Sequence, residues 1–532
     1  MKNPEIFVVM VLYMCAVIGI GIYFYKRAQR SSESYFLGGR SLGPWVAAMS
    51  AEASDMSGWL LMGLPGVAYW CGLADAFWTA IGLAIGTYVN WLIVAKRLRN
   101  YSQVAGNSIT IPDFFSNRFK ENKKIVLGIS SAFILIFFTV YASSCFVTVG
   151  KLFNTLFEFD YHVTLIIGAL FVVAYTLIGG FLAESVSDFM QAIVMILALI
   201  AMIVVGVVNA GGFGAVVENS QAIDGFLSLG ELANPTVDAA GTQLSESDTP
   251  LFGAAKNYGF LNVISMLAWG LGYFGVPQVL LRFMAIRKAD EIKRSRIIAT
   301  SWCFISLAAA VFIGIIGRTL LPVHGVLNTK SGAESILIVM STEYLPLIVA
   351  GLIMAGILAA TISSSDSYLL IASSSVSVNI FKGIIKKDKA SDKQVMWISR
   401  ITLVVIALIG VVIAWNEESV IFSLVSFAWA GFGATFGPLM LFSLFWKRMT
   451  RVGAISGMLA GGISVFLWKL VLNEFLSDTV PFFGLYELLP AFIISSVAIV
   501  IGSLLSKAPS KEITDEFDAV KSGNVEDIAE EA

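Results

Sequence analysis

Long apolar runs limit most strongly what this chain can fold into. Backbone N–H and C=O groups inside lipid must be hydrogen-bonded within the protein, so a run that crosses a bilayer is expected to be a helix of about 20 residues. Thirteen runs of this kind predict an all-α integral membrane protein with about 13 transmembrane helices. They lie at residues 5–25, 42–70, 75–95, 125–154, 162–182, 187–209, 257–285, 298–320, 344–380, 396–415, 419–446, 452–472 and 486–506.

The composition supports this class and argues against several others. Of the 532 residues, 57% are hydrophobic and 14% are charged, whereas a soluble domain carries about 25% charged residues. The net charge of −2 offers no basic surface to nucleic acid, and no feature indicates an obligate protein partner. Four scattered cysteines and two isolated histidines form no zinc or haem motif, so no cofactor is expected. No nucleophile–base pair or phosphate loop suggests an enzyme.

Lysine and arginine predict which side of the membrane each connection faces. These residues gather in the connections that follow odd-numbered runs, at 26–40, 96–124, 287–296, 382–393 and 447–451. Positively charged connections stay in the cytoplasm, so we expect the N-terminus outside and the C-terminus inside. The first apolar run is too long for a signal-peptide core and is expected to remain as a span.

Two of the runs contain residues that interrupt a helix. The second run carries ASDMSGW (53–59), and the seventh carries AWGLGYFGVPQ (268–278) with three glycines and a proline. Inside a helix, glycine costs about 1 kcal/mol and proline about 3 kcal/mol. Either break alone could be a packing kink, but paired interrupted helices in two halves are typical of transporters with a midplane site.

The interrupted runs are five runs apart, which suggests two five-helix units at 41–210 and 257–446. An odd number of spans per unit inverts the second unit relative to the first. The other segments are a leading helix with a cytoplasmic loop at 1–40, an extracellular loop at 211–256 and two trailing transmembrane helices at 447–506. We expect the acidic residues 507–532 to form a solvated, poorly ordered cytoplasmic tail.

Several long motifs resemble those of a known transporter family. They are YFLGGRSLGPW (35–45), SAEASDMSGWL (50–60), FFTVYASS (137–144), AYTLIGGFLAESVSDFMQA (174–192), AWGLGYFGVPQVLLRFMA (268–285), ILAATISSSDSYLL (357–370) and AWAGFGATFGPLMLFSLFWKRMTRVGAISGM (428–458). From the first span to about residue 470 the chain is similar to the solute:sodium symporters. The resemblance implies a LeuT-like five-plus-five inverted repeat in the bacterial cytoplasmic membrane. AWGLGYFG followed by Pro277 favours the proline-transporting branch over the sugar and pantothenate branches.

The resemblance also implies a sodium site, with sodium as the coupling ion and no other metal. The family holds sodium with backbone carbonyls of the first broken helix and of the ninth span, and with two neighbouring hydroxyls. The matching residues are Ala53, Met56 and Ala360 through carbonyls, and Ser363 and Ser364 through side chains. From the residues alone, segment 362–367 could equally be a hydroxyl-rich patch for helix packing.

Acidic and basic positions follow from the same resemblance. Asp55 matches an aspartate that sodium-coupled function requires, and Asp188 matches an acidic residue on the inner sodium route. A charge placed in mid-span costs roughly 3 kcal/mol, which a cation pathway can justify. Arg40 matches a cytoplasmic-side arginine tied to gating.

The substrate site is implied at the two breaks. Ser57 and Gly58 are expected to form the break on which the substrate carboxylate rests, because a half-helix N-terminus attracts anions. Around the ring of L-proline the resemblance implies Tyr141, Trp269, Tyr273 and Pro277.

These features together predict sodium-coupled secondary active uptake of L-proline by alternating access. A symporter of the same fold for another small organic solute is the alternative. A membrane sensor would need an output domain after the spans, where the sequence has only the polar residues 507–532. An ion channel would give no reason for paired broken helices around a midplane pocket.

Overall fold

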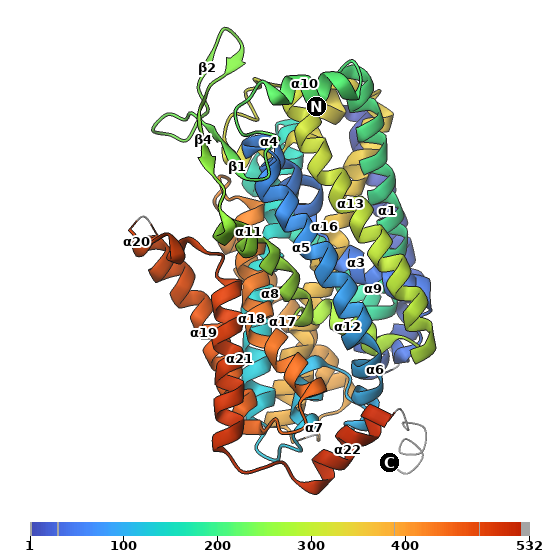
Figure 1. Ribbon diagram of the computed structural model, residues 1–532. Coiled ribbons are helices and arrows are strands. Elements are labelled where there is room, and N and C mark those ends of the chain that lie inside the picture. The colour runs from blue at the N-terminus through green and yellow to red at the C-terminus, as the bar shows by residue number, and fades with distance from the viewer. Residues whose placement is uncertain (1–2, 29–30, 388, 478, 523–532) are drawn as a thin grey trace.

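A bundle of long, roughly parallel helices makes up most of the protein (Figure 1). The computed structural model describes residues 3–28, 31–387, 389–477 and 479–522. The first described residues lie at the end of the bundle that carries the β-strands, and the last described residues lie at the opposite end. These two ends are called the hairpin end and the C-terminal end below.

The elements before the strands are α1 (Pro4–Ala28), α2 (Ser32–Leu37), η1 (Gly38–Arg40), α3 (Pro44–Asp55), η2 (Trp59–Gly63), α4 (Leu64–Cys71), α5 (Leu73–Val89), η3 (Asn90–Val94), α6 (Ala95–Val104), α7 (Ile111–Arg118), α8 (Ile125–Phe157), α9 (Tyr161–Asn209) and α10 (Phe213–Gln221). The strands are β1 (Glu231–Pro235), β2 (Ser245–Glu246), β3 (Thr249–Pro250) and β4 (Phe252–Asn257).

The elements after the strands are α11 (Phe260–Leu267), η4 (Ala268–Phe274), α12 (Pro277–Ala285), η5 (Ala289–Glu291), α13 (Ile292–Leu320), α14 (Lys330–Ala333), α15 (Ile336–Tyr344), α16 (Leu347–Ser374), η6 (Ser375–Ile385), α17 (Asp392–Ile413) and α18 (Ile421–Phe445). The last elements are α19 (Arg451–Leu467), η7 (Trp468–Asn473), α20 (Glu474–Leu476), η8 (Pro481–Gly484), α21 (Leu488–Leu505) and α22 (Lys511–Ser522).

Ten helices of the described chain are long and apolar enough to cross a membrane, or eleven if the bent pair 260–285 counts as one span. The predicted runs 42–70 and 162–182 hold shorter helices instead, so the predicted number of 13 is not established. The boundary predicted at 183–186 is wrong, because those residues are helical. The chain bends at Gly180, whose φ of 65° is accessible mainly to glycine.

The first predicted break lies between α3 and η2. Helix α3 ends at Asp55, and Met56 leaves the helical region with φ −89° and ψ 76°. The interruption therefore covers Met56 and Ser57, and Gly58 already has helical dihedrals. A Cβ on Gly58 would lie 2.3 Å from Thr148 Oγ1, so glycine is needed there for the close approach of α8.

The second predicted break lies between η4 and α12, where the chain bends by 41°. Gly275 and Val276 separate the two helices, and Pro277 occupies the first turn of α12, where a missing N–H costs nothing. Glycine in η4 serves packing as well. A Cβ on Gly270 would lie 2.2 Å from the Gly82 carbonyl oxygen, so η4 and α5 touch through their backbones.

One expectation for the polar segments is incomplete and another is wrong. The fold is mostly helical, as predicted, but residues 211–257 add α10 and two short antiparallel pairs, β1 with β4 and β2 with β3. This connection is anchored on the bundle through Leu73 N–H, which donates to the Phe226 carbonyl at 2.8 Å. Within the predicted tail, residues 511–522 form the docked helix α22, and residues 523–532 lie outside the described residues.

Helix α16 is the centre of the bundle. Nearly every one of its residues from Ala350 to Ser374 is buried, which is expected of a helix that has neighbours on all sides. It packs against α8, α9 and α1. Its middle faces the α3 break, and this position brings its serines to the candidate site.

Candidate functional site

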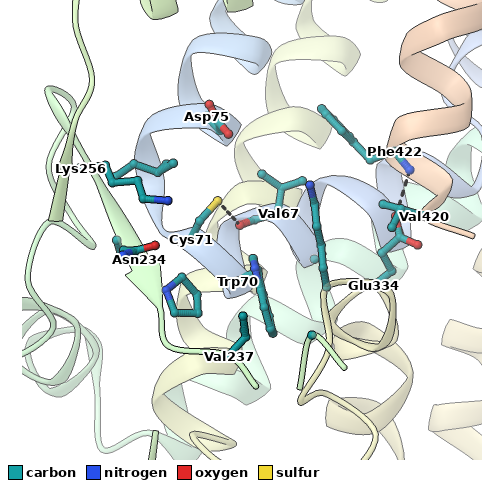
Figure 2. A pocket seen from close by; sticks show the side chains of 16 residues that line it. Val67, Trp70, Cys71, Asp75, Asn234, Val237, Lys256, Glu334, Val420 and Phe422 are labelled. Atoms are coloured by element: carbon teal, nitrogen blue, oxygen red, sulfur yellow. Dashed lines mark hydrogen bonds between the residues drawn. The ribbon is translucent and has the colours of Figure 1, made fainter. Parts of the chain in front are cut away.

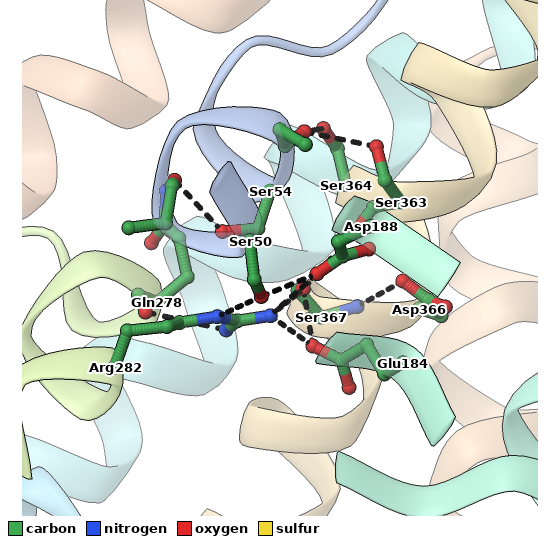
Figure 3. A network of polar contacts seen from close by, with 12 residues as sticks. Ser50, Ser54, Glu184, Asp188, Gln278, Arg282, Ser363, Ser364, Asp366 and Ser367 are labelled. Atoms are coloured by element: carbon green, nitrogen blue, oxygen red, sulfur yellow. Dashed lines mark hydrogen bonds and ion pairs between the residues drawn. The ribbon is translucent and has the colours of Figure 1, made fainter. Parts of the chain in front are cut away.

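Two serine hydroxyls of α16 meet the end of the first broken helix (Figure 3). Ser363 Oγ donates to the Ala53 carbonyl at 2.9 Å, and Ser364 Oγ donates to the same oxygen at 3.2 Å. Ser363 Oγ also lies 3.1 Å from the Ala360 carbonyl oxygen. Four of the five residues predicted for sodium are thus in contact, and Met56, the fifth, lies in the break itself.

The oxygens gathered here are neutral, and this decides which ions they suit. Hydroxyls and carbonyls from an unwound helix are the ligands that transporters use for sodium. The described residues contain no group of three or more histidine, cysteine, aspartate or glutamate side chains that could hold a metal ion. The arrangement therefore favours a singly charged hard cation over a transition metal.

Asp55 joins the two broken helices. Its Oδ2 accepts a hydrogen bond from Tyr273 OH at 2.8 Å, and its Oδ1 accepts one from Gln278 Nε2 at 3.4 Å. The backbone carbonyl of Asp55 accepts from Tyr141 OH at 3.2 Å. The carboxylate thus links α3 to η4 and α12, a contact that brings together residues more than 200 positions apart. Sequence reasoning missed Gln278, because a glutamine after a proline carries no distinctive signal.

Aromatic rings enclose the second break. The Trp269 ring lies 5.2 Å from that of Tyr486 and 5.1 Å from that of Phe422, measured between centroids. Trp429 Nε1 donates to the Trp269 carbonyl at 2.8 Å, and the Trp429 ring meets the Tyr273 ring edge-on at 5.1 Å. Trp269 and Tyr273 were predicted, whereas Trp429 and Tyr486 were not, because aromatic residues are frequent in spans and these two follow no motif of the break.

The remaining predicted substrate residues are divided between the first break, which Tyr141 contacts, and the start of α12, where Pro277 lines a cavity of about 10 Å³ beside Thr110. Tyr141 stacks on Tyr368 with ring centroids 4.2 Å apart. The hydroxyl of Ser57 is buried and has no hydrogen-bond partner among the described residues. A buried hydroxyl without a partner is costly, so a polar group of a bound solute would be stabilising at this position.

A buried ion cluster lies beside the serines (Figure 3). Arg282 Nη2 pairs with Glu184 Oε1 and, at 3.1 Å, with Asp188 Oδ2. Ser50 Oγ donates to Asp188 Oδ2 at 2.7 Å and accepts from Arg282 Nε at 3.0 Å. Asp366 lies in the same cluster, where its Oδ1 accepts from Ser367 N–H at 2.8 Å.

This cluster gives Asp188 a partner that the sequence did not predict. The prediction placed it on a sodium route, and the structure pairs it with a guanidinium that sequence reasoning did not single out. Charges in a protein interior are tolerated when they are paired and hydrogen-bonded, which explains why Arg282, Glu184 and Asp188 occur together.

Arg40 connects three segments at the C-terminal end of the bundle. Its Nη1 donates to the Met284 carbonyl at the end of α12 at 2.8 Å and to Ser102 Oγ of α6 at 3.0 Å. Its Nη2 donates to the Ser108 carbonyl at 2.8 Å. Burial, with the nearby charge of Arg99, lowers the pKa of Arg40 to about 10, so the side chain remains charged at neutral pH.

The spaces on the two sides of the site differ in size. At the hairpin end, a cavity of about 410 Å³ is lined by Trp70, Asp75 and Phe422, among others (Figure 2). Phe422 forms the boundary between this cavity and the Trp269 ring. Towards the C-terminal end, the cavity beside Thr110 and Ser374 measures only about 10 Å³.

Comparison with known proteins places the chain among membrane transporters. Residues 35–461 match the sodium:solute symporter family. A sodium/proline symporter of Staphylococcus aureus (strain USA300 / TCH1516) is 39% identical over 521 residues, which cover 98% of this chain and 96% of that protein.

Two solved structures share the fold. A sodium-coupled sialic acid symporter in a substrate-bound outward-open state matches with a TM-score of 0.73 at 20% identity, over 95% of this chain and 99% of that chain. A nucleobase-cation-symport-1 family transporter in a closed conformation matches with a TM-score of 0.51 at 12% identity, over 91% of this chain and 98% of that chain. Both likenesses concern the arrangement of the helices.

Proposed function

The chain belongs to the sodium:solute symporter family, and we propose that it carries L-proline into a bacterial cell together with sodium. Likeness to a sodium/proline symporter along nearly the whole chain supports this solute. The aromatic walls around the second break support it too, because a flat apolar ring needs apolar faces on both sides. Both ligands are cargo, and the reaction is transport by alternating access.

The contact of Ser363 and Ser364 with the Ala53 carbonyl is the observation that carries the proposal. In the proposed site, sodium sits between these two hydroxyls and the carbonyls of Ala53, Met56 and Ala360. The hydroxyl hydrogens turn away from Ala53 when the ion binds, because a cation takes the lone pairs. Sodium then ties α16 to α3 at the break, and this contact couples ion binding to the position of the broken helix.

The solute site lies next to the ion. The proline carboxylate is proposed to bind at Ser57 and Gly58, where the hydroxyl has no partner and a half-helix begins. The ring lies among Trp269, Tyr273 and Tyr141. Pro277, at the start of α12, is proposed to bound the site on the side of the small cavity that it lines. The secondary ammonium then faces aromatic surfaces, which attract cations.

Charged residues serve the path of the ion and the closure of the site. Asp55 attracts sodium and holds the two breaks together through Tyr273. Asp188 lies on the route by which sodium leaves towards the cytoplasm, and its partner Arg282 must move when the ion passes. Arg40 is a gating residue, because it ties α12 to α6 at the closed end.

The architecture follows from the same proposal. Residues 41–210 and 257–446 form the two inverted repeats, 1–40 the leading helix and loop, 447–506 the two trailing helices, 211–256 an extracellular connection and 507–532 a cytoplasmic segment. The hairpin end faces outside and the C-terminal end faces the cytoplasm of the bacterial cell, as the positive charges of the connections require.

Reconstitution tests the proposal. Purified protein in proteoliposomes should accumulate radiolabelled L-proline when an inward sodium gradient is present, and uptake should collapse when sodium is replaced by a bulky cation. Five-membered cyclic imino acids should compete in part, since an apolar wall discriminates by only about 1–3 kcal/mol per methylene. Stronger competition by a sugar or by pantothenate would assign the site to another solute, and uptake without sodium would refute the coupling.

A further inference from the structure

The polar C-terminal helix α22 is amphipathic and packs on the bundle. Its buried side chains are Ile513, Phe517 and Val520, spaced four and three residues apart, so they share one face of the helix. Phe517 is only 4% exposed. The helix lies across the C-terminal end, next to α6 and α7 (Figure 1). Its position is thus defined by apolar contacts as well as by charge.

Phe517 brings three separate elements together. The guanidinium carbon of Arg97, on α6, lies 4.8 Å from the centre of the Phe517 ring, and that of Arg118, on α7, lies 5.5 Å from it. Cations over an aromatic face are attracted, more strongly when they are desolvated, as Arg118 is. Arg118 Nε in turn donates to the Ser443 carbonyl of α18 at 3.1 Å.

Ion pairs connect the acidic side chains of α22 to the bundle. Lys120, just after α7, pairs with Glu516 and, at 3.5 Å, with Glu512. Lys447, just after α18, pairs with Asp518. Lys447 and Asp518 are about half exposed, with 48% and 52% of their side-chain surface accessible. Exposed pairs of this kind are weak individually and are screened by salt.

The elements that α22 covers also make the contacts that connect the helices at the C-terminal end of the bundle. Helix α6 is tied to the end of α12 in two ways. Arg99 Nε donates to the Ile286 carbonyl just after α12, and Arg40 of η1 bridges Ser102 Oγ of α6 and the Met284 carbonyl of α12. Helix α22 fastens α6 and α7 to the turn after α18. Opening of this end by movement of α6 away from α12 would shift the surface on which α22 rests, and the contacts of α22 with α7 and with the turn after α18 oppose that movement.

We propose that α22 is an autoinhibitory clasp that keeps the C-terminal end of the transporter closed and loosens as ionic strength on that side rises. The acidic residues Glu512, Glu516 and Asp518 supply the salt-sensitive part, and Phe517 keeps the helix in place when the ion pairs are weakened. The inference adds a regulatory element to the proposed function. It depends on that function only for the identity of the transported solute.

The first experiment compares transport at two ionic strengths. Protein reconstituted with α22 facing the lumen is assayed with luminal KCl at about 0.01 M and about 0.1 M, which shortens the Debye length from about 30 Å to about 10 Å. Sucrose keeps the osmolality constant. Wild-type turnover should rise roughly twofold to fivefold, because salt screens the pairs of Lys447 with Asp518 and of Lys120 with Glu512, and more weakly the less exposed pair of Lys120 with Glu516. The triple variant Glu512→Gln/Glu516→Gln/Asp518→Asn should be fast at both salt concentrations.

Asp515 offers a matched control on the same helix. It is exposed and carries the same charge, so Asp515→Asn should retain the salt response of the wild type. A charge exchange tests the contact itself. Asp518→Lys alone should behave like the released clasp, and Asp518→Lys with Lys447→Glu should restore the response to salt. A triple variant with the wild-type response, or an Asp515→Asn variant without one, would overturn the proposal.

A second readout does not need the solute. Ser374 is buried beside the small cavity towards the C-terminal end, so Ser374→Cys reports opening there once the four native cysteines are replaced by serine. A maleimide added from that side should alkylate the triple variant about threefold faster than the parent at low salt, and high salt should remove the difference. Equal rates at low salt would refute the clasp even if L-proline proved not to be the solute.

Discussion

At the scale of single residues, the hydroxyls of α16 fall into two groups. Thr361, Ser365 and Ser373 donate to carbonyls of their own helix, which is the usual habit of hydroxyls inside a helix. Ser363 and Ser364 also reach across to Ala53 on α3, and only Ser363 has a carbonyl of its own helix, that of Ala360, within reach as well. The difference separates packing hydroxyls from hydroxyls that can serve a ligand between two helices.

Replacing Ser363 or Ser364 by alanine should weaken sodium binding. Each change removes one oxygen and little volume, so the apparent affinity for sodium should fall by roughly tenfold, the effect of losing one charge-assisted contact. Proline affinity should fall through its coupling to sodium and recover in part at high sodium. Sodium-dependent uptake kinetics measure both effects.

Ser365→Ala is the control, since that hydroxyl donates to the Thr361 carbonyl at 2.6 Å within α16. It should leave the sodium requirement unchanged. Normal sodium dependence in both Ser363→Ala and Ser364→Ala, at normal expression, would show that the ion binds elsewhere.

Two substitutions at Asp55 distinguish the contribution of its charge to transport from the contribution of its shape. Asp55→Asn keeps the size and the hydrogen bond with Tyr273 but loses the charge, whereas Asp55→Glu keeps the charge and shifts it by one methylene. If the carboxylate attracts the cation, Glu should retain more transport than Asn and should require more sodium. Initial uptake rates over a sodium titration decide the order, and wild-type transport by Asp55→Asn would reduce the residue to a support for the break.

At the scale of elements, both breaks depend on glycine because a neighbouring helix comes close. At Gly58 the backbone dihedrals are ordinary, and space is limiting, because Thr148 of α8 lies within contact distance of any added carbon. At Gly275 an added Cβ would lie 2.3 Å from the Phe432 carbonyl of α18. The breaks are therefore places where a neighbouring helix approaches the unwound backbone closely.

Gly58→Ala should be destabilising, and a second change should relieve it. The added methyl would lie 2.3 Å from Thr148 Oγ1 and 2.6 Å from Thr148 Cγ2, and overpacking of this kind costs about 1–3 kcal/mol. Gly58→Ala/Thr148→Ala removes both atoms and should recover part of the loss. The melting temperature of the purified protein and its proline uptake report the effect.

Gly19→Ala provides the comparison, because nothing lies within 4 Å of the Cβ added there. That variant should match the wild type in both measurements. Equal losses in Gly58→Ala and Gly58→Ala/Thr148→Ala would argue that the conformation of the break, and not the contact with α8, requires glycine.

Elements with strong local signals could be predicted from the sequence. Apolar length and the Gly and Pro residues of 268–278 indicate spans and breaks without reference to distant residues. Helix α22 was missed because it has only three large apolar residues in an acidic segment. One of them, Phe517, packs against Arg97 and Arg118, which lie far away in the sequence. The strands after residue 211 were missed because two of them are only two residues long and largely exposed, so they carry no alternating apolar pattern.

The candidate site was predictable only in part for the same reason. Ser363, Ser364 and Asp55 stand out locally as polar groups in apolar runs. Arg282, Gln278 and Trp429 do not, since their importance comes from partners far away in the chain. Single-sequence patterns contain no information on such pairs.

At the scale of the whole molecule, the two ends of the bundle differ, and this difference bears on the direction of transport. Contacts of Arg40 and Arg99 connect the helices at the C-terminal end, while a cavity of about 410 Å³ at the hairpin end reaches Phe422. A solute entering from the hairpin end would meet the aromatic boundary first and the ion site beyond it. This asymmetry agrees with uptake from the outside, in the orientation proposed from the positive charges.

Coupling to one sodium ion makes uptake electrogenic, and the size of the effect can be derived. Moving one elementary charge through 100 mV releases about 2.3 kcal/mol, and about 1.4 kcal/mol corresponds to a tenfold ratio of concentrations. Because L-proline is a neutral zwitterion, a potential of 100 mV alone supports about fiftyfold accumulation.

Proteoliposomes with equal sodium on both sides and a potassium diffusion potential, negative inside, measure this ratio directly. Accumulation should follow the imposed voltage and vanish when the potential is short-circuited. A ratio that ignores voltage would mean that a second charge moves in the opposite direction, and the proposed site with one cation and no net charge on the solute would then be incomplete.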